Sequence, residues 1–379
     1  MENIPIWKLD NPYINLKLDF LRDINILIRK NFKSKYKLFK KLNSSNIPYS
    51  TFKNYFKYSY YKAGYFAPLH IFLKICKKLN ISKEKIQEKV VSYKPAHGYN
   101  IIEKPILPIK ITPIFDMILA HNIGDGTVIR SKGRKAYFGY RQFDETFRVG
   151  YVKKLEAIFG KIKYKEDYFL KSTRPYCPAI LASAFFYYYN LNDGSFLSTS
   201  ARLPDKLLNK NKEHLLAVLL GFIIDEGNID STAIVIKLKN PKLVNELYFI
   251  CRKLGYDATA TYKEEYGNLY IKRKGMKNLF ADYNKLLKLY PEINLGKWHQ
   301  KIKESFDIYN REIYKTRGNK EIILELIKEK DLTVNQIASQ IQMTRQGVRF
   351  HIHNLEKAKE IIKKGYFGKG NMVYGYRGR

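Results

Sequence analysis

Two carboxylates, Asp125 and Glu226, each end an apolar stretch and precede a glycine. Residues 118–126 read ILAHNIGDG, and residues 219–227 read LLGFIIDEG. The two acids are 101 residues apart, which is the length of a small domain repeat. At the C-terminal end of a helix, the dipole disfavours an acid by about 0.3–1 kcal/mol. We therefore expect a positive group or a cation to compensate both acids.

Small residues in the two stretches would allow two such helices to pack closely. Ala120 and Gly124 in the first copy and Gly221 in the second are placed for a crossing of the two backbones. If the helices run parallel, Asp125 and Glu226 meet, and adjacent carboxylates need a proton or a cation. Oxygen ligands without neighbouring Cys or His favour a hard ion such as Mg²⁺ or Mn²⁺. Such an ion could polarise a phosphodiester and activate water.

Two lysines keep the same distance from these acids. Lys171 lies 46 residues after Asp125, and Lys272 lies 46 residues after Glu226. Both could stabilise developing negative charge or orient the attacking water. A single Asp-Gly after a helix is usually only a turn. Two copies followed by the same order of elements favour a duplicated catalytic site.

Two polar residues inside the stretches have less certain roles. Asp225 precedes Glu226 and is either a secondary acid or a polar residue facing solvent. His121 stands within the first apolar stretch. We expect it to be a partly exposed packing residue and not a metal ligand.

The hydrophobic pattern predicts the order αββαββα in each half. The first half begins with Thr112 as helix cap and Pro113 at the first helical position, which suits proline. The second begins near Asn211. Strands with a period of two, at residues 135–143 and 232–239, leave a basic outer face on each sheet. The residues that we expect to contact DNA from these faces are Arg130, Lys135, Tyr137, Arg141, Lys237 and Lys239.

The charge of the chain points to a nucleic-acid partner. Among 379 residues, 69 Lys and Arg outnumber 35 Asp and Glu, which gives a net charge of +34. Such an excess favours phosphate binding with counterion release. No apolar run approaches the 20 or so residues of a membrane span, and no signal peptide is evident. We expect a cytoplasmic protein that binds double-stranded DNA, and neither a membrane nor a small-molecule substrate.

The N-terminal residues 1–94 predict a helical domain with helix-turn-helix proportions. Ser50 would cap its second helix and direct Thr51, Lys53 and Asn54 towards a major groove. A small solvated helical bundle is the alternative. Residues 95–112 contain several prolines and no helical period, which is typical of a linker.

The C-terminal residues 319–379 predict a winged helix, with three helices followed by a hairpin. Thr344 caps the third helix, which leaves Arg345, Gln346 and Arg349 exposed on its N-terminal part. A recognition helix uses that part on base edges and phosphates. A winged helix that binds protein is the alternative.

The two nine-residue stretches resemble the signature of the LAGLIDADG homing endonucleases, and the resemblance extends over about residues 111–315. Leu203-Pro204 and the helix that follows add to it. The resemblance implies an α+β fold of two tandem repeats, residues 113–203 and 204–315, whose antiparallel sheets form a saddle in the major groove. It also implies that the last acid of each signature, Asp125 and Glu226, binds a divalent metal ion.

The family also uses a lysine near each centre, which Lys171 and Lys272 match. The internal repeat implies a monomer, and Met1 and Gly378-Arg379 in place of splicing residues indicate a free-standing member. His121 and Asn122 replace usually apolar residues, and Asp225 replaces a usually small one. A site-specific DNA endonuclease is the first hypothesis. A catalytically inactive DNA-binding regulator of the same fold and a protein that acts in RNA maturation are the alternatives.

Overall fold

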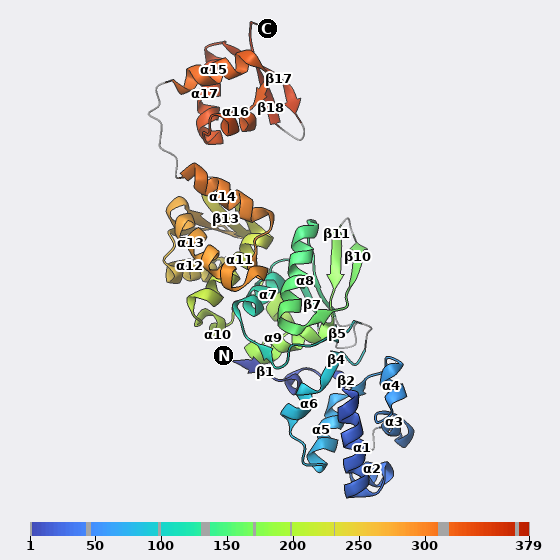
Figure 1. Cartoon of the computed structure of the whole chain (residues 1–379). Helices are drawn as coiled ribbons and strands as arrows, with labels where there is room; N and C mark the ends of the chain where they lie inside the picture. Colours follow the sequence, from blue (N-terminus) through green and yellow to red (C-terminus); the bar gives the residue numbers. More distant parts are fainter. Residues whose placement is uncertain are drawn as a thin grey trace. The chain divides into compact units, whose positions relative to one another are not determined.

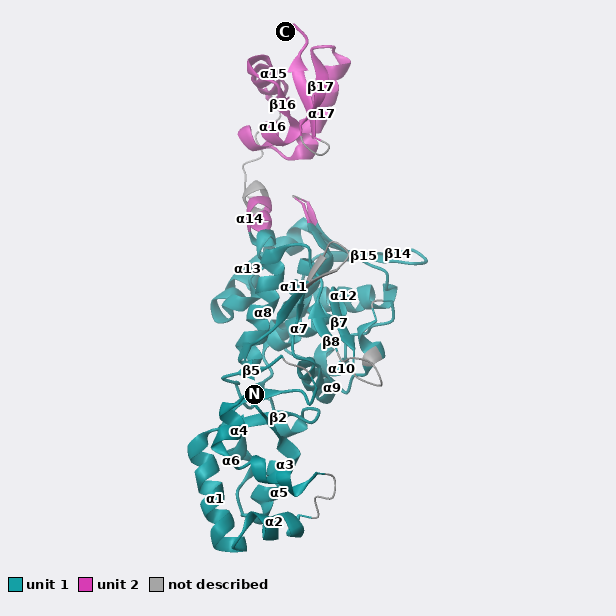
Figure 2. Ribbon diagram, turned by 90° about the vertical axis from the view of Figure 1, so that its right-hand side faces the viewer, with its two compact units in different colours: residues 1–228, 234–299 teal, residues 229–233, 300–379 magenta. Residues whose placement is uncertain are grey.

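The computed structural model describes residues 2–42, 47–97, 100–129, 137–169, 172–197, 199–230, 232–309, 318–367 and 371–378. They form two compact units (Figure 2): unit 1 is Met1–Asn228 with Ile234–His299, and unit 2 is Ile229–Ala233 with Gln300–Arg379. In these ranges, no helix is both long and apolar enough to cross a lipid bilayer.

Two buried helices, α7 (Pro113–Ile123) and α11 (Lys212–Glu226), pack along each other in unit 1 (Figure 1). Every residue of α7 is buried, and so is every residue of α11 from Leu215 to Ile224. A helix that is apolar all round must be covered on all sides. Thr112 occupies the N-cap position of α7 and Pro113 begins the helix, although the Thr112 side chain makes no capping hydrogen bond.

The two backbones approach closely at small residues. A Cβ atom added to Gly221 would lie 2.8 Å from the Cβ of Ala120, and one added to Gly124 would lie 2.6 Å from Oδ2 of Asp225. Both distances are shorter than the non-bonded contacts that Cβ atoms make in proteins. A side chain at Gly221 would therefore overlap Ala120, and one at Gly124 would displace the Asp225 carboxylate.

Each helix is followed by two strands, a helix, two strands and a further helix, and the first α/β segment has one additional short strand, β9 (Lys161–Ile162), before its second strand pair. The first α/β segment continues after α7 with β7 (Gly126–Ile129), β8 (Tyr137–Tyr140), α8 (Glu145–Phe159), β9 (Lys161–Ile162), β10 (Lys165–Phe169), β11 (Ser172–Tyr176), η2 (Ala179–Leu181), α9 (Ala182–Tyr189) and η3 (Asp193–Phe196). After α10 (Asp205–Leu208) and α11, the second α/β segment continues with β12 (Gly227–Ile229), β13 (Ala233–Leu238), α12 (Pro241–Leu254), β14 (Ala258–Tyr262), β15 (Gly267–Lys272), α13 (Arg273–Leu289), η4 (Pro291–Ile293) and α14 (Lys297–Tyr309).

The two sheets share one strand order. The first runs β10-β11-β8-β7, and the second runs β14-β15-β13-β12 when it is read from its corresponding edge. Neighbouring strands are antiparallel in the pairs β7–β8, β10–β11 and β14–β15. Along β13, Ile234, Ile236 and Leu238 are buried, whereas Lys237 is exposed. The alternation predicted from the sequence is present in this strand.

The N-terminal helices join the first α/β segment through a shared sheet. These helices are α1 (Leu18–Phe32), α2 (Lys35–Lys41), α3 (Tyr49–Asn54), α4 (Tyr58–Lys62), α5 (Leu69–Lys78) and α6 (Lys83–Glu88). The sheet contains, in spatial order, β3 (Ala67–Pro68), β2 (Tyr13–Leu16), β4 (Val90–Lys94), β5 (Ile102–Glu103) and β9. Strand β5 lies within the stretch expected to be a linker. That stretch also contains β6 (Ile109–Lys110), which pairs with β1 (Asn3–Ile4).

One capping prediction in this part is wrong. Helix α3 begins at Tyr49, its N-cap residue is Pro48, and no side chain caps it. Pro48 already has the extended conformation of a cap residue (φ −63°, ψ 147°). Ser50 therefore lies inside the helix, where it is exposed.

The C-terminal part of unit 2 contains three helices and a three-stranded sheet. Its elements are α15 (Asn319–Glu329), β16 (Leu332–Thr333), α16 (Val334–Gln340), α17 (Arg345–Lys357), β17 (Ile361–Phe367) and β18 (Asn371–Tyr376). The Thr344 side chain caps α17 by accepting from the Gly347 amide. Val348, Ile352 and Leu355 of this helix are buried. Arg345, Gln346 and Arg349 are exposed, as the sequence predicts.

The contact between Gly221 and Ala120 gives a stability prediction. Gly221→Ala should lower the free energy of unfolding by about 1–3 kcal/mol, because the added methyl group overpacks the helix interface. Adding Ala120→Gly should recover most of the loss. The matched control is Gly150→Ala in α8, where a Cβ would make only an ordinary contact at 3.7 Å with Lys154 Nζ. Equal effects of Gly221→Ala and Gly150→Ala in urea denaturation would contradict the close approach.

Candidate active site

The acids lie where the two buried helices end. Glu226 is the last residue of α11, and Asp125 follows α7 by two residues. The glycine after each acid is required, since the chain folds back against its own helix. A Cβ at Gly126 would lie 2.3 Å from the Asn122 Cα, and one at Gly227 would lie 2.3 Å from the Ile223 carbonyl oxygen. The motif ends are thus fixed by the same contact in both segments.

Burial and mutual repulsion make these acids hold their protons tightly. Burial, followed by the charges of Asp225 and Glu226, raises the pKa of Asp125 to about 8. The pKa of Glu226 is raised as well, by burial and by the charge of Asp225. Near neutral pH this end of the helix pair therefore carries protons that a cation could displace.

Asp125 is oriented by residues at the end of β8. The Gln142 side-chain amide donates to Oδ2 of Asp125 at 2.5 Å, and the Arg141 backbone amide donates to the Asp125 carbonyl at 2.9 Å. The Gln142 hydrogen bond and the Arg141 charge both lower the pKa of Asp125, against the larger effect of burial. The residues that follow β8 are held in place by buried Arg148, whose Nη1 donates to the carbonyls of Gln142 and Phe143 at 2.9 Å.

Gln142 was not predicted from the sequence. It lies 17 residues after Asp125, and its contact forms only because β8 returns antiparallel to β7. A usable signal would have been a polar amide at the point where the second strand of the segment ends. Arg141 was predicted to contact DNA, and it also lies close to the acid.

Asp225 does not face solvent, which corrects one of the two possibilities left open by the sequence. Its side chain is fully buried and accepts hydrogen bonds from the Tyr140 hydroxyl at 2.5 Å and from His121 Nδ1 at 3.0 Å. Burial raises the pKa of Asp225, while the hydrogen bonds from Tyr140 and the Asp125 amide and the charge of Lys154 act in the opposite direction.

The expectation that His121 is partly exposed is wrong, because only 1% of its side chain is accessible. Burial, with a contribution from the charge of Lys154, holds the pKa of His121 well below its usual value. The ring is therefore neutral, and its Nδ1 forms the hydrogen bond with Asp225. Burial also lowers the pKa of Lys154 to about 8, although the charge of Asp225 opposes this shift.

The other predicted residues fall into three groups. Lys272 ends β15, and its Nζ lies 3.7 Å from a carboxylate oxygen of Asp257, with both side chains about half exposed. On the sheets, Lys237 and Lys239 are exposed and Tyr137 is half-buried. Three predicted residues lie outside the described part of the chain, namely Lys171, Arg130 and Lys135.

The donor set fits a hard cation that has further ligands from elsewhere. Among the described residues, no group of three or more His, Cys, Asp or Glu side chains is arranged to hold a metal ion. Asp125 and Glu226 supply two carboxylates, and the pKa of each is raised by burial and then by negative charge nearby. Mg²⁺ is commonly held by one or two carboxylates together with substrate phosphates and water. Two acids are therefore sufficient if a phosphate supplies the other ligands.

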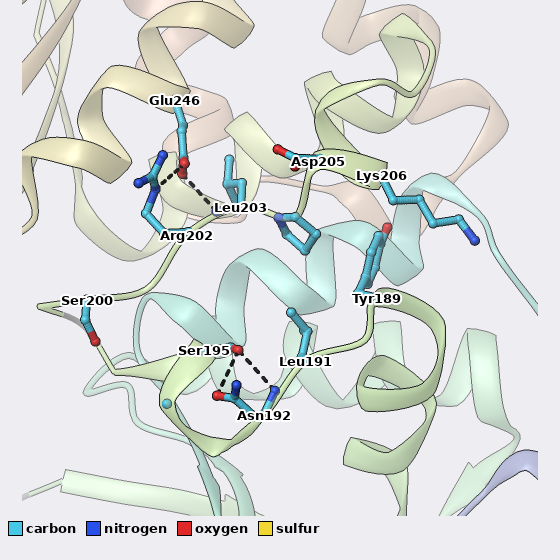
Figure 3. A pocket seen from close by; sticks show the side chains of 12 residues that line it. Tyr189, Leu191, Asn192, Ser195, Ser200, Arg202, Leu203, Asp205, Lys206 and Glu246 are labelled. Carbon is cyan, nitrogen blue, oxygen red and sulfur yellow. Dashed lines mark hydrogen bonds and ion pairs between the residues drawn. The ribbon is translucent and has the colours of Figure 1, made fainter.

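A cavity of about 590 Å³ lies elsewhere in unit 1, between η3 and α10. Figure 3 shows Arg202 paired with Glu246, whose second oxygen accepts from the Leu203 amide at 2.8 Å. Asp125 and Glu226 do not line this cavity. Arg202 and Glu246 thus neutralise each other, and the acid end of the helix pair is the better candidate for chemistry.

The raised pKa of Asp125 predicts a pH dependence of stability without metal. An unfolded Asp has a pKa of about 3.9, so between pH 4 and 8 the folded protein binds this proton more tightly than the unfolded chain does. In EDTA the free energy of unfolding should therefore fall as pH rises from 5 to 8. The fall should be smaller in Asp125→Asn. Superimposable pH profiles for the two proteins in chemical denaturation would rule out the shift.

Comparison with known proteins gives a partial structural likeness. No family model and no curated protein matches the chain. Among solved structures, I-DmoI in complex with DNA and Ca is 14% identical with a TM-score of 0.37, over 50% of this chain and 97% of that one. I-WcaI bound to its DNA recognition sequence is 15% identical with a TM-score of 0.36, over 47% and 83%. The meganuclease I-AabMI is 11% identical with a TM-score of 0.34, over 52% and 90%. These three solved structures are LAGLIDADG homing endonucleases, similar to this chain at low identity and over about half of its length.

Proposed function

We propose that this protein is a site-specific endonuclease that hydrolyses double-stranded DNA with a divalent metal ion. The observation that carries the proposal is the pair of carboxylates, Asp125 and Glu226, at equivalent ends of two closely packed buried helices. Burial, followed by the negative charges nearby, raises the pKa of each acid. A net charge of +34 supplies the attraction for a polyanion.

The chemistry divides between the ion and the side chains. A cation held by Asp125 and Glu226 would supply Lewis acidity to a phosphodiester and lower the pKa of a water molecule. Gln142 fixes the orientation of the Asp125 carboxylate through its hydrogen bond. Asp125 must release its proton to act as a ligand, so binding is favoured as pH rises towards 8. Lys272, and Lys171 by its matched spacing, are proposed to stabilise negative charge on the phosphate.

The proposed DNA path follows the basic faces of the two sheets. Lys237 and Lys239 are exposed on the second α/β segment, and Arg141 lies beside Asp125 on the first. We propose that the two segments act as tandem LAGLIDADG repeats. The N-terminal helices, with Thr51, Lys53 and Asn54, would extend the contact as a helix-turn-helix domain. The C-terminal part, with Arg345, Gln346 and Arg349, would extend it as a winged helix.

A DNA-binding regulator without nuclease activity is the second candidate. One observation favours it: the Nζ of Lys272 is engaged by Asp257 at 3.7 Å, so this lysine is not held ready at the acid pair. The ion pair is half exposed, and exposed ion pairs contribute only about 0–1 kcal/mol. Lys272 could therefore be released when DNA binds, which is why the endonuclease remains the first candidate.

Removal of either acid should abolish cleavage and leave DNA binding intact. Asp125→Asn and Glu226→Gln should each reduce cleavage of library DNA in Mg²⁺ by about 100-fold or more, because each change removes a metal ligand. In electrophoretic mobility shift assays with EDTA, both variants should bind DNA with the affinity of the wild type. The control is Glu84→Gln, an exposed acid in α6. Tight binding by the wild type with no acid-dependent cleavage would instead support the regulator.

The proposed recognition helix gives a separate binding prediction. Arg349→Ala should weaken binding to duplex DNA and reduce the slope of log K against log salt by about 0.9, the value for one phosphate contact. Lys330→Ala serves as control, since Lys330 is exposed beyond the end of α15. Fluorescence anisotropy titrations at several salt concentrations between about 50 and 200 mM measure both the affinity and its salt dependence. Equal slopes for the two variants would exclude α17 from the interface.

A further inference from the structure

Polar side chains fill core positions of the first α/β segment that are apolar in the second. Helices α7 and α11 correspond by the 101-residue spacing, and α8 and α12 correspond by their cap residues, Asp144 and Asn240. Five of the buried residues that carry polar groups in the first segment are His121, Asn122, Tyr140, Tyr151 and Lys154. Their buried counterparts in the second are Phe222, Ile223, Ile236, Leu247 and Ile250. At these five positions the polar side chains are therefore confined to the first segment.

Asp225, from the second segment, reaches into this polar core. Its carboxylate accepts from Tyr140 at 2.5 Å, from His121 at 3.0 and 3.1 Å, and from the backbone amide of Asp125. At the corresponding position of α7 stands Gly124, and the Asp225 carboxylate occupies the space that a Cβ there would fill. All of these hydrogen-bond partners of Asp225 belong to the first segment.

The surrounding groups hold these donors in place. The Tyr140 ring stacks on that of Tyr151, with centroids 4.4 Å apart and planes 16° from parallel. The Tyr151 hydroxyl donates to Asn122 Oδ1 at 2.7 Å. Tyr140 is therefore fixed by stacking on Tyr151, whose own position is set by its hydrogen bond to Asn122, as is typical of groups that orient a ligand.

Stability alone does not account for this arrangement. Buried polar groups must recover a desolvation cost, and apolar side chains of similar volume often serve at least as well. The second segment shows that apolar residues do fill the same positions. What hydrogen bonds add over apolar packing is direction, because their strength depends on distance and angle.

We propose that Asp225 is a positioning residue for the acid pair. Its hydrogen bonds fix the last turn of α11 against the end of α7, so that Glu226, the next residue, is held facing Asp125. The inference rests on the proposed function, since it assumes that Asp125 and Glu226 share a metal ion. Asp225 acts through these two acids and does not itself contact the ion.

The test measures Mn²⁺ binding to the full chain without DNA, by isothermal titration calorimetry, alongside thermal unfolding. Asp225→Ala should weaken Mn²⁺ affinity by about 10- to 100-fold, the usual effect of removing a residue that orients a metal ligand. Asp225→Asn keeps the size and one acceptor oxygen and should recover most of the affinity. If Asp225→Ala does not fold, Tyr140→Phe removes a single donor and should weaken affinity by about 5-fold.

Asp116 provides the matched control. It is the other fully buried acid of the helix pair, at the opposite end of α7, and it accepts from Lys210 Nζ at 2.8 Å, His214 Nδ1 at 2.6 Å and Tyr189. Asp116→Asn should lower the unfolding temperature without changing Mn²⁺ affinity. A merely structural role for Asp225 predicts the same behaviour for both residues.

Three outcomes would separate the possibilities. Unchanged Mn²⁺ affinity in folded Asp225→Ala would overturn the proposal. Equal losses in Asp225→Asn and Asp225→Ala would also overturn it, since Asp225 would then act through its charge and not by positioning. If Asp125→Asn leaves Mn²⁺ binding unchanged, the acid pair is not the metal site, and the proposed function fails independently of Asp225.

Discussion

The close packing of α7 against α11 is the constraint on which the rest of the structure depends. The two helices touch where Gly221 faces Ala120 and where Gly124 faces Asp225, and a Cβ atom at either glycine would overlap the facing side chain. A fully buried carboxylate links the two helices near each end. Asp116 of α7 contacts His214 near the N-terminal ends, and Asp225 of α11 contacts His121 near the C-terminal ends. The strands that follow each helix then form two sheets of the same order.

This packing also creates an electrostatic problem at the acid end. Three carboxylates are gathered where the helix dipoles are negative, and burial raises the pKa of all three. Hydrogen bonds with Tyr140 and His121 offset the cost of burying the Asp225 carboxylate. The hydrogen bond from Gln142 offsets that cost for Asp125 only in part. The remaining negative charge is best relieved by a proton or a divalent cation, which links the fold to the proposed chemistry.

The elements were predictable where short-range periodicity decides them. Pro113 begins α7, and buried and exposed residues alternate along β13, both as the sequence indicates. The contacts of Asp225 and His121 were not predictable, because they depend on the rotation of α11 relative to α7. Gln142 reaches Asp125 only through the return of β8, and the pairing of Lys272 with Asp257 depends on its side-chain direction. Such contacts connect residues that no local pattern relates.

The central claim is that the helix pair brings Asp125 and Glu226 together to share one divalent ion on DNA. The most direct measurement is the anomalous diffraction of Mn²⁺ in a crystal of the protein with a bound DNA duplex. The account predicts a single strong peak between the two acids, with an oxygen of each carboxylate and of one phosphate at about 2.1 Å. A bound duplex with Mn²⁺ elsewhere, or with no ion between the two acids, would contradict it.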